Sequence, residues 1–356
     1  RNIIINGAMN VAQRGTSSTS TGHATVDRFA LSTSSIDEDP TQAQVDVASG
    51  TTPYTLGFRK AYRITNGNQT GGANAGDRIV IYSEFEAQDV ANSGWNYTSS
   101  SSFITLSYWV KSSVAQNFYF RLQTSDGTAQ NYVMETGSLS ADTWTKIEKT
   151  IPGNSNLQFD NDVNQGLSIL WSMFRGTDTT GSMSLNTWAA YSSSTRTPDN
   201  TSTWYTTNDA TFEITGVQLE VGSQATAFEH RSFNEELLLC KRYFNMIGDG
   251  ALGAGTAMSD GFIWNSSGTE LDFMYTFPVQ MRTTPSIYQV TGGNYFKILG
   301  GGLNSTTYVD GNFSIQYASK IATSQYATMD TAGTVGRSCH ITINNTLTKY
   351  GYSAEL

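Results

Sequence analysis

The chain has 356 residues, of which 38% are hydrophobic and 14% charged, and its formal net charge is −9. This length allows two domains with separate cores, and plentiful aromatic residues with modest net charge argue against disorder. Acidic charge without a Lys/Arg cluster argues against nucleic-acid binding and a membrane-surface patch, and no apolar run approaches the ~18 residues of a bilayer span, so membrane insertion is not expected.

Short runs of alternating apolar and polar residues predict β-strands through most of the chain, most clearly in 103–111 and 117–123. The apolar members of these two strands are expected to face a core: Ile104, Leu106, Tyr108, Val110, Phe118, Phe120 and Leu122. Further strands are expected in 2–5, 28–31, 61–64, 78–85, 144–151, 166–174 and 211–221. Eight or nine strands of this kind fit a two-sheet jelly roll.

The stretch 211–247 is expected to join two parts of the chain. Its first half alternates as a strand, and the period slips at Gly216, as at a β-bulge. Ser232 and Glu235 then form an S-x-x-E capping box, which predicts a helix over 232–247. The wide apolar face of that helix predicts burial against more than one neighbour.

A second β region follows the predicted helix. The glycine-rich stretch 248–255 is expected to be a linker, and strands are expected in 262–264, 271–277, 286–290, 295–298, 313–317 and 340–343. The prediction is an all-β protein. It has an N-terminal jelly-roll β-sandwich in 1–231, one short linking α-helix in 232–247 and a C-terminal β-sandwich domain in 248–356.

The two cysteines, Cys240 and Cys339, are expected to be free buried thiols, with a disulfide as the alternative. Three scattered histidines are too few for a zinc site. Residues 160–166 resemble a calcium loop, with weak candidate ligands Asp160, Asp162 and Asn164. Gln165 stands where an EF-hand needs glycine, so an Asx-rich turn is favoured. No cofactor is expected, and calcium is the alternative left open.

Two aromatic loops are the candidate site for glycan recognition, which needs flat apolar rings beside amide or carboxylate groups. The loops are 92–98 and 188–208. Their candidate glycan-binding residues are Trp95, Tyr97, Trp188, Tyr191, Trp204 and Tyr205. The competing interpretation is that these rings pack beneath long loops as small satellite cores.

No catalytic motif was found: the sequence contains no GxSxG, HExxH or P-loop. A glycosidase needs two carboxylates across the scissile bond. The acidic residues considered for that role are Asp37, Glu38, Asp39, Glu84, Glu86, Glu213 and Glu220. Glu220 is expected instead to fix a strand end by accepting hydrogen bonds.

Several motifs resemble bacteriophage tail-fibre and receptor-binding proteins with a carbohydrate-binding-module-like jelly roll. They are QLEVGSQATAFEHRS followed by EELLLCKRYF, the opening IINGAMNVAQRG, and Asp27-Arg28 followed by Phe29. The resemblance covers residues 2–245, loosely in the middle, and the final residues 352–356 also look like the end of such proteins. Because the chain starts at Arg1 without a methionine, it is expected to be part of a longer polypeptide or to have a trimmed start.

The resemblance implies a non-enzymatic virion structural protein, a tail fibre or spike exposed on the phage particle, that binds the host cell surface. Its implied partners are a host surface glycan or outer-membrane receptor, two further copies of itself in a homotrimer, and other virion tail proteins. The linking helix would then lie near the three-fold axis. Two alternatives stay open: a depolymerase that hydrolyses surface polysaccharide, and a purely architectural capsid or tail fibre or adaptor.

Overall fold

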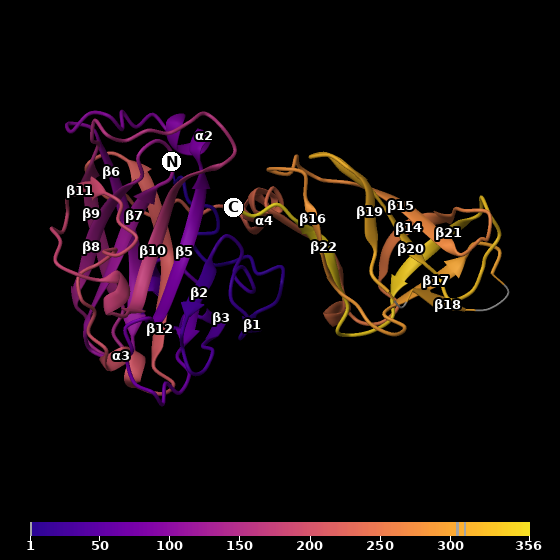
Figure 1. Cartoon of the computed structure of the whole chain (residues 1–356), viewed down its shortest axis with the longest axis horizontal. Helices are drawn as coiled ribbons and strands as arrows, with labels where there is room; N and C mark the ends of the chain where they lie inside the picture. The colour runs from indigo at the N-terminus through magenta and orange to yellow at the C-terminus, as the bar shows by residue number, and fades with distance from the viewer. Residues whose placement is uncertain (1, 304–305, 310) are drawn as a thin grey trace. The chain divides into compact units, whose positions relative to one another are not determined.

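The computed structural model describes residues 2–303, 306–309 and 311–356, so Arg1 lies outside the described residues. The chain divides into two compact units, 1–237 with Leu356 and 238–355. Antiparallel strands dominate both units, which confirms the all-β class. Figure 1 shows the first unit in indigo to salmon and the second in orange to yellow.

The first unit is a jelly-roll sandwich of two six-stranded antiparallel sheets, counted over the described residues (Figure 1). One sheet has the order β1 (Ser17–Ser18), β3 (Thr41–Asp46), β4 (Lys60–Thr65), β12 (Thr211–Val221), β6 (Phe103–Ser112), β9 (Thr145–Pro152). The other, here called the cleft sheet, has the order β11 (Trp188–Ala190), β8 (Gln130–Ser138), β7 (Asn117–Thr124), β10 (Gln165–Arg175), β5 (Arg78–Glu86), β2 (Ala30–Ser34). Short helices lie between strands: α1 (Thr52–Thr55), α2 (Ala87–Ala91), η1 (Thr177–Thr179) and α3 (Thr203–Thr206).

The core of this unit lies between the two sheets, where the alternating positions of β6 and β7 are buried as predicted. Trp171 of β10 is a central core residue, with ring centroids 6.2 Å from Phe29 and 5.8 Å from Tyr108. Because one face of each strand fills this core, the alternate residues of the cleft sheet face outward.

The closing strand β12 has the predicted bulge. Its register against β6 shifts between Thr215 and Gln218, and Gly216 has φ 63°. A Cβ on Gly216 would lie 2.6 Å from the Phe58 ring, so glycine is needed there for both conformation and space. Residues 2–5, by contrast, form no strand. They lie beside β12, and a backbone hydrogen bond from Ile3 N to Leu219 O, at 2.9 Å, joins the two segments.

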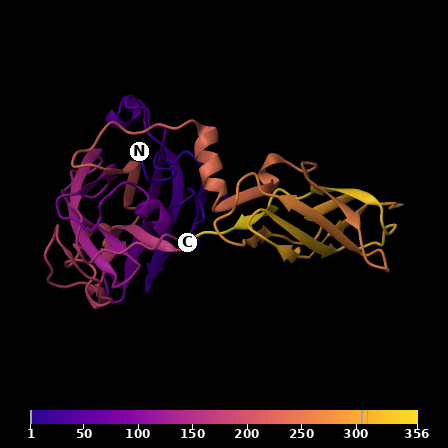
Figure 2. The same ribbon diagram turned by 90° about the horizontal axis from the view of Figure 1, so that it is seen from above.

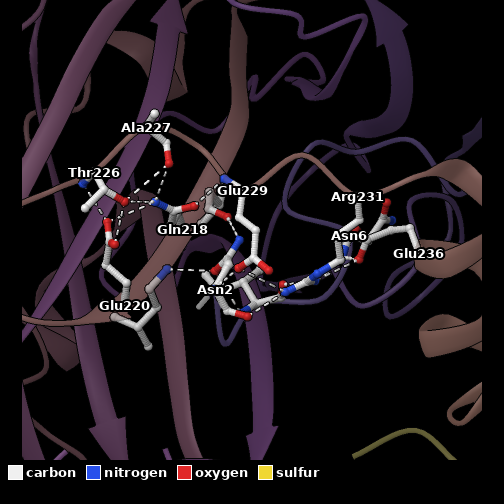
Figure 3. A network of polar contacts seen from close by, with 12 residues as sticks. Asn2, Asn6, Gln218, Glu220, Thr226, Ala227, Glu229, Arg231 and Glu236 are labelled. Carbon is white, nitrogen blue, oxygen red and sulfur yellow. Dashed lines mark hydrogen bonds and ion pairs between the residues drawn. The ribbon is translucent and has the colours of Figure 1, made fainter.

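The QLE motif at the end of β12 forms a polar network with the segment that follows it (Figure 3). Glu220 accepts hydrogen bonds from the backbone N and Oγ1 of Thr226, at 2.8 and 2.7 Å, and from Gln218 Nε2 at 2.9 Å. Gln218 Oε1 in turn accepts from the backbone N of Glu229 at 2.8 Å. The expectation that Glu220 fixes a strand end is confirmed.

The same network continues to the N-terminal segment (Figure 3). Asn2 Oδ1 accepts from Leu219 N at 3.0 Å, and its backbone N donates to Glu229. Arg231 donates to Asn2 O at 2.6 Å and lies 3.4 Å from Glu236 Oε1, which also accepts from Asn6 N. The N-terminal segment is therefore tied by side chains to the end of β12 and to the segment that follows it, more than 200 residues later in the sequence.

Replacing Glu220 by glutamine should lower the free energy of unfolding by about 1–2 kcal/mol, because the amide nitrogen cannot accept the hydrogen bond from Thr226. Burial raises the pKa of Glu220, but the hydrogen bonds from Thr226 and Gln218 outweigh it and hold the pKa below its ordinary value. The charged form is therefore favoured by folding, and its contribution is present above the unfolded pKa of ~4.3 and lost as the pH falls through the folded pKa.

Chemical denaturation across a pH series should then show the two proteins differing most near neutrality and converging in acid. Glu148→Gln is the matched control, because that carboxylate is half exposed and forms a surface ion pair with Lys146, at 2.5 Å. A wild type no more stable than Glu220→Gln at neutral pH would contradict the role given to this carboxylate.

Helix α4 (Phe233–Lys241) starts at the predicted capping box, with Ser232 N donating to Glu235 Oε2 at 2.8 Å and Glu235 N donating to Ser232 Oγ at 3.3 Å. Figure 2 shows it as a coiled ribbon in salmon. The prediction that it extends to residue 247 is wrong. Strand β13 (Phe244–Asp249) begins instead and pairs with β22 (Lys349–Ser353), because cross-strand partners override the helical period.

The predicted apolar face is buried in part: Cys240, Tyr243 and Phe244 are buried, whereas Phe233 and Leu239 are 54% and 37% exposed. The linker expectation is wrong. The stretch 248–255 is not a plain linker, because it contains the end of β13 and the 3-10 helix η2 (Gly250–Leu252).

The second unit contains a three-stranded and a seven-stranded antiparallel sheet, counted over the described residues. The smaller has the order β13, β22, β16 (Ser286–Val290). The larger has the order β18 (Thr307–Val309), β17 (Phe296–Gly300), β21 (Ser338–Ile343), β14 (Ala257–Ile263), β15 (Glu270–Thr276), β20 (Ala322–Thr328), β19 (Ser314–Ala318). Its core is rich in rings, with Phe313 5.4 Å from Phe273 and 5.1 Å from Tyr350. Cys240 and Cys339 are buried thiols that form no disulfide, as predicted.

Candidate functional site

Four of the six aromatic residues predicted to form a glycan platform are buried, which corrects that prediction. Trp95 is 3% exposed, Trp188 is 8% exposed, and Trp204 and Tyr205 are fully buried. The indole N–H groups of the three tryptophans donate to backbone carbonyls, those of Ser102, Pro152 and Thr211. These rings therefore pack beneath the loops as core residues.

The two remaining candidates, Tyr97 and Tyr191, are half-buried, and their surroundings differ. The Tyr97 ring meets Phe159 edge to face, with centroids 4.9 Å apart, and continues the core packing around Trp95. Tyr191 instead lies on the outward side of the cleft sheet among guanidinium groups. Tyr191 is the one predicted residue around which a polar site is built.

The outward face of the cleft sheet carries rows of residues aligned by strand pairing. The register places Tyr82, Leu170, Arg121 and Val133 in one row across β5, β10, β7 and β8. The next row contains Glu84, Ser168, Gln123 and Asn131. Figure 1 shows these four strands side by side. Most residues of these two rows line a cleft, together with Ser32, Arg78, Arg175 and two residues of the 190–200 loop, Tyr191 and Arg196.

The loop after β11 forms one wall of this cleft. Tyr191 N donates to Ala129 O at 2.8 Å, which fixes the start of the loop against the edge of β8. Farther along, Arg196 N donates to Thr179 O at 2.9 Å, and Asn131 Nδ2 donates to Arg196 O at 3.2 Å. These contacts hold the Tyr191 and Arg196 side chains at the cleft.

Four arginines line the cleft: Arg78, Arg121, Arg175 and Arg196. Two of them are almost wholly buried, Arg121 at 1% exposure and Arg175 at 2%. Arg121 Nη1 donates to Gln123 Oε1 at 2.6 Å and to Asn131 Oδ1 at 3.0 Å. The Tyr191 ring lies near two of these groups, with its centroid 5.6 Å from the Arg121 guanidinium and 5.9 Å from that of Arg196.

The arginines are mutually repulsive, and three of them leave donors unused. Arg78 Nε, Arg121 Nε and Arg175 Nη1 are buried with no hydrogen-bond partner among the described protein groups. Burial lowers the pKa of Arg175, and the nearby charges of Arg121, Arg196 and Arg78 lower it further. Burial likewise lowers the pKa of Arg121 and of Arg78, and Arg196 adds to each effect. Glu84 carries the one side-chain carboxylate among the described residues that line the cleft, and the final residue, Leu356, lines it too.

The sequence offered a signal for this site that the loop-centred prediction missed. Arg78, Arg121 and Arg175 all lie on strands of the cleft sheet whose other faces are strongly apolar, and a charged residue on an interior strand is uncommon unless it is paired. Three such residues on three neighbouring strands indicate a shared polar face. The tryptophans are a weaker signal for a binding site, because large rings also suit a core.

The loop proposed as a weak calcium site forms an Asx-type turn. Asn164 N donates to Asp162 Oδ1 at 2.9 Å, and Asp160 Oδ1 accepts from Gln158 Nε2 at 2.9 Å. Within the described ranges, no group of three or more His, Cys, Asp or Glu side chains could hold a metal ion. These contacts are those of a turn closed by its own side chains.

Several carboxylates considered for catalysis have identifiable structural partners. Glu213 is buried and pairs with Arg63 at 2.7 Å and Lys111 at 3.1 Å. Asp37 accepts from Gly71 N at 2.6 Å, and Glu38 accepts from Asn68 N at 2.5 Å. Glu84 lines the cleft, whereas Glu86, two residues along β5, is buried and accepts from Gln88 Nε2 at 2.6 Å.

Comparison with known proteins gives no sequence match, and the similar structures named below have TM-scores of 0.33 or lower. No family model matches the chain, and no curated protein matches it. Among the described residues, no helix is long and apolar enough to cross a membrane.

Similar solved structures include the enzymatically active domain of tailspike protein 4 from bacteriophage CBA120 (8% identity, 62% of this chain, TM-score 0.33). A putative sugar-binding protein from Bacteroides thetaiotaomicron is also similar (10% identity, 62% of this chain and all of that one, TM-score 0.33). So is the N-terminal cellulose-binding domain of β-1,4-glucanase C from Cellulomonas fimi (9%, 61% and 99%, TM-score 0.29). The aligned region spans 21% of the tailspike chain.

Proposed function

We propose that the first unit binds a saccharide on the outward face of its cleft sheet, between β5, β10, β7 and the 190–200 loop. The observation that carries the proposal is the position of Tyr191, half-buried at the cleft beside Arg121 and Arg196. A ring supplies area for the C–H face of a sugar, and neighbouring amide and guanidinium groups supply donors for its hydroxyls. Gln123, Gln165 and Ser168 add such groups along the sheet.

The biological role we propose is that of a non-enzymatic phage structural protein, a tail fibre or spike that attaches to a host surface glycan. The N-terminal motif and the QLEVGSQATAFEHRS segment support this proposal through their resemblance to such proteins. Assembly as a homotrimer belongs to the same proposal, and light scattering on the purified chain should give three times the monomer mass. A stable monomer would contradict the trimer.

The rival activity, polysaccharide hydrolysis, is tested separately. Incubation of the chain with host capsule or lipopolysaccharide should release no new reducing ends, because a glycosidase needs two carboxylates across the bond it cleaves. Glu84 is the one acidic side chain among the described residues that line the cleft. Release of reducing ends that disappears in Glu84→Gln would overturn the non-enzymatic proposal.

Binding to a glycan microarray should be lost or weakened at least about tenfold by Tyr191→Ala, because removal of a stacking ring costs roughly 1.4 kcal/mol. Tyr97→Ala is the matched control: it removes a half-buried ring of the other predicted loop, which packs on Phe159 instead of lining the cleft. If Tyr97→Ala abolished binding and Tyr191→Ala did not, the site would lie on the other loop. If wild type bound no saccharide, the proposed function would fail.

A further inference from the structure

The charge of the cleft has the opposite sign to that of the chain. The whole chain has a formal net charge of −9, yet the described residues that line the cleft include four arginines and one acidic side chain, together with the final residue, Leu356. A buried cation is costly unless an opposite charge or hydrogen bonds compensate it. The Arg121 and Arg175 side chains are nearly all buried, so the cluster needs an explanation beyond surface solubility.

The described protein groups compensate this charge only in part. Arg175 Nε donates to Ser172 Oγ at 3.1 Å, and Arg78 Nη2 donates to Ser32 Oγ at 3.3 Å, so both have neutral partners. Arg121 is likewise held by the amide oxygens of Gln123 and Asn131. The nitrogens without protein partners, Arg78 Nε, Arg121 Nε and Arg175 Nη1, belong to three strands that lie side by side in the cleft sheet.

We propose that this cleft binds a saccharide that bears a carboxylate group, with the carboxylate held by Arg121 and Arg175 and the sugar ring against Tyr191. The inference rests on the proposed function and adds the class of saccharide. Guanidinium is planar and presents paired N–H groups that match the two oxygens of a carboxylate. The guanidiniums of Arg121 and Arg196 lie within 5.6 and 5.9 Å of the Tyr191 ring centroid, so the ring and the guanidinium N–H groups are close enough to contact the same ligand.

The crowding of cations supports the same ligand chemistry. Burial is the largest cause that lowers the pKa values of Arg175, Arg121 and Arg78, and the charges of neighbouring arginines lower them further. The charged forms of these three side chains are therefore disfavoured in the free protein. A bound anion reverses that interaction, so part of the binding free energy is relief of repulsion. The clustered arginines therefore lower the free energy of unfolding of the unliganded protein, a cost that is common at binding sites.

Titration calorimetry with pairs of sugars that differ in one group tests the inference. The probes are D-galacturonate with D-galactose, D-glucuronate with D-glucose, and N-acetylneuraminate, with acetate and sulfate as simple anions. At least one acidic sugar should bind wild type about tenfold or more tightly than its neutral counterpart and than acetate or sulfate. Affinity should fall as salt is raised, because part of the attraction is between charges.

The variant Arg175→Met should lose the preference for acidic sugars while remaining as stable as wild type or becoming more stable, because it removes a cation that its neighbours repel. A residue with only a structural role would instead lower stability. Arg59→Met is the matched control, since Arg59 lies over the Tyr54 ring at 4.0 Å and is not one of the residues that line the cleft. It should leave binding unchanged although it removes the same charge.

The remaining outcomes of the titrations each overturn the inference. Equal binding of acidic and neutral sugars would overturn this inference and leave the saccharide site standing. Acetate or sulfate binding as tightly as the acidic sugars would make this a general anion site and overturn it too. If none of the acidic sugars binds, the inference fails. The microarray result then decides whether the saccharide site fails with it.

Discussion

Replacing Trp204 by alanine should lower the free energy of unfolding by about 3–5 kcal/mol, the range typical for removal of a buried tryptophan or phenylalanine. The side chain is fully buried in α3, its backbone N donates to Gln116 Oε1 at 2.9 Å, and its indole N–H donates to Thr211 O at 3.0 Å. The substitution would therefore leave a cavity and remove one of the two hydrogen bonds that Thr211 O accepts, the other coming from Ser113 N at 3.0 Å.

Urea denaturation checks this value, with Tyr191→Ala as the comparison. Tyr191 is half-buried at the cleft, so its removal should cost much less stability. The two residues were predicted to act together on one glycan platform, and the experiment separates them. A Trp204→Ala protein of wild-type stability that had lost saccharide binding would restore the platform and contradict the burial described above.

Replacing Gly7 by alanine should lower the free energy of unfolding by about 3 kcal/mol or more. A Cβ at this position would lie 2.0 Å from the backbone oxygen of Val217, and backbone cannot move aside as a flexible side chain can. The same residues are joined by a hydrogen bond from Val217 N to Gly7 O at 2.9 Å. The N-terminal segment would have to leave the bulge of β12, and the network around Asn2 and Arg231 would be strained with it.

Gly181→Ala is the matched control, because the added Cβ would meet only the Thr195 side chain, at an ordinary 3.4 Å. It should change stability by less than about 1 kcal/mol in either direction. Thermal and urea unfolding of both variants measure the difference. A Gly7→Ala protein as stable as Gly181→Ala would show that the N-terminal segment does not pack against β12 as described.

Much of the fold could be predicted from local sequence because its determinants are local. The strict alternation of 103–111 places Ile104 and Leu106 in the core, Gly216 marks the bulge, and Ser232 with Glu235 starts the helix. The end of that helix could not be predicted in the same way. Phe244 continues an apolar helical stripe, but its backbone pairs with Ser353, more than a hundred residues later.

The candidate site was harder to predict because it depends on register between strands. Arg78 pairs with Arg175 across β5 and β10, and Arg121 lies opposite Leu170 across β10 and β7, contacts that no local pattern reveals. Aromatic residues in polar loops look the same whether they bind a ligand or close a core. Burial separates Trp204 from Tyr191, and burial follows from the packing of the whole sandwich.

The location of a bound acidic sugar tests the account most directly. A crystal structure of the chain with the tightest-binding acidic sugar of the titration panel should show its carboxylate within hydrogen-bond distance of Arg121 and Arg175 and its ring against Tyr191, on the outward face of β10 and β7. A sugar bound on the 92–98 loop, or on any surface away from the four arginines, would contradict it.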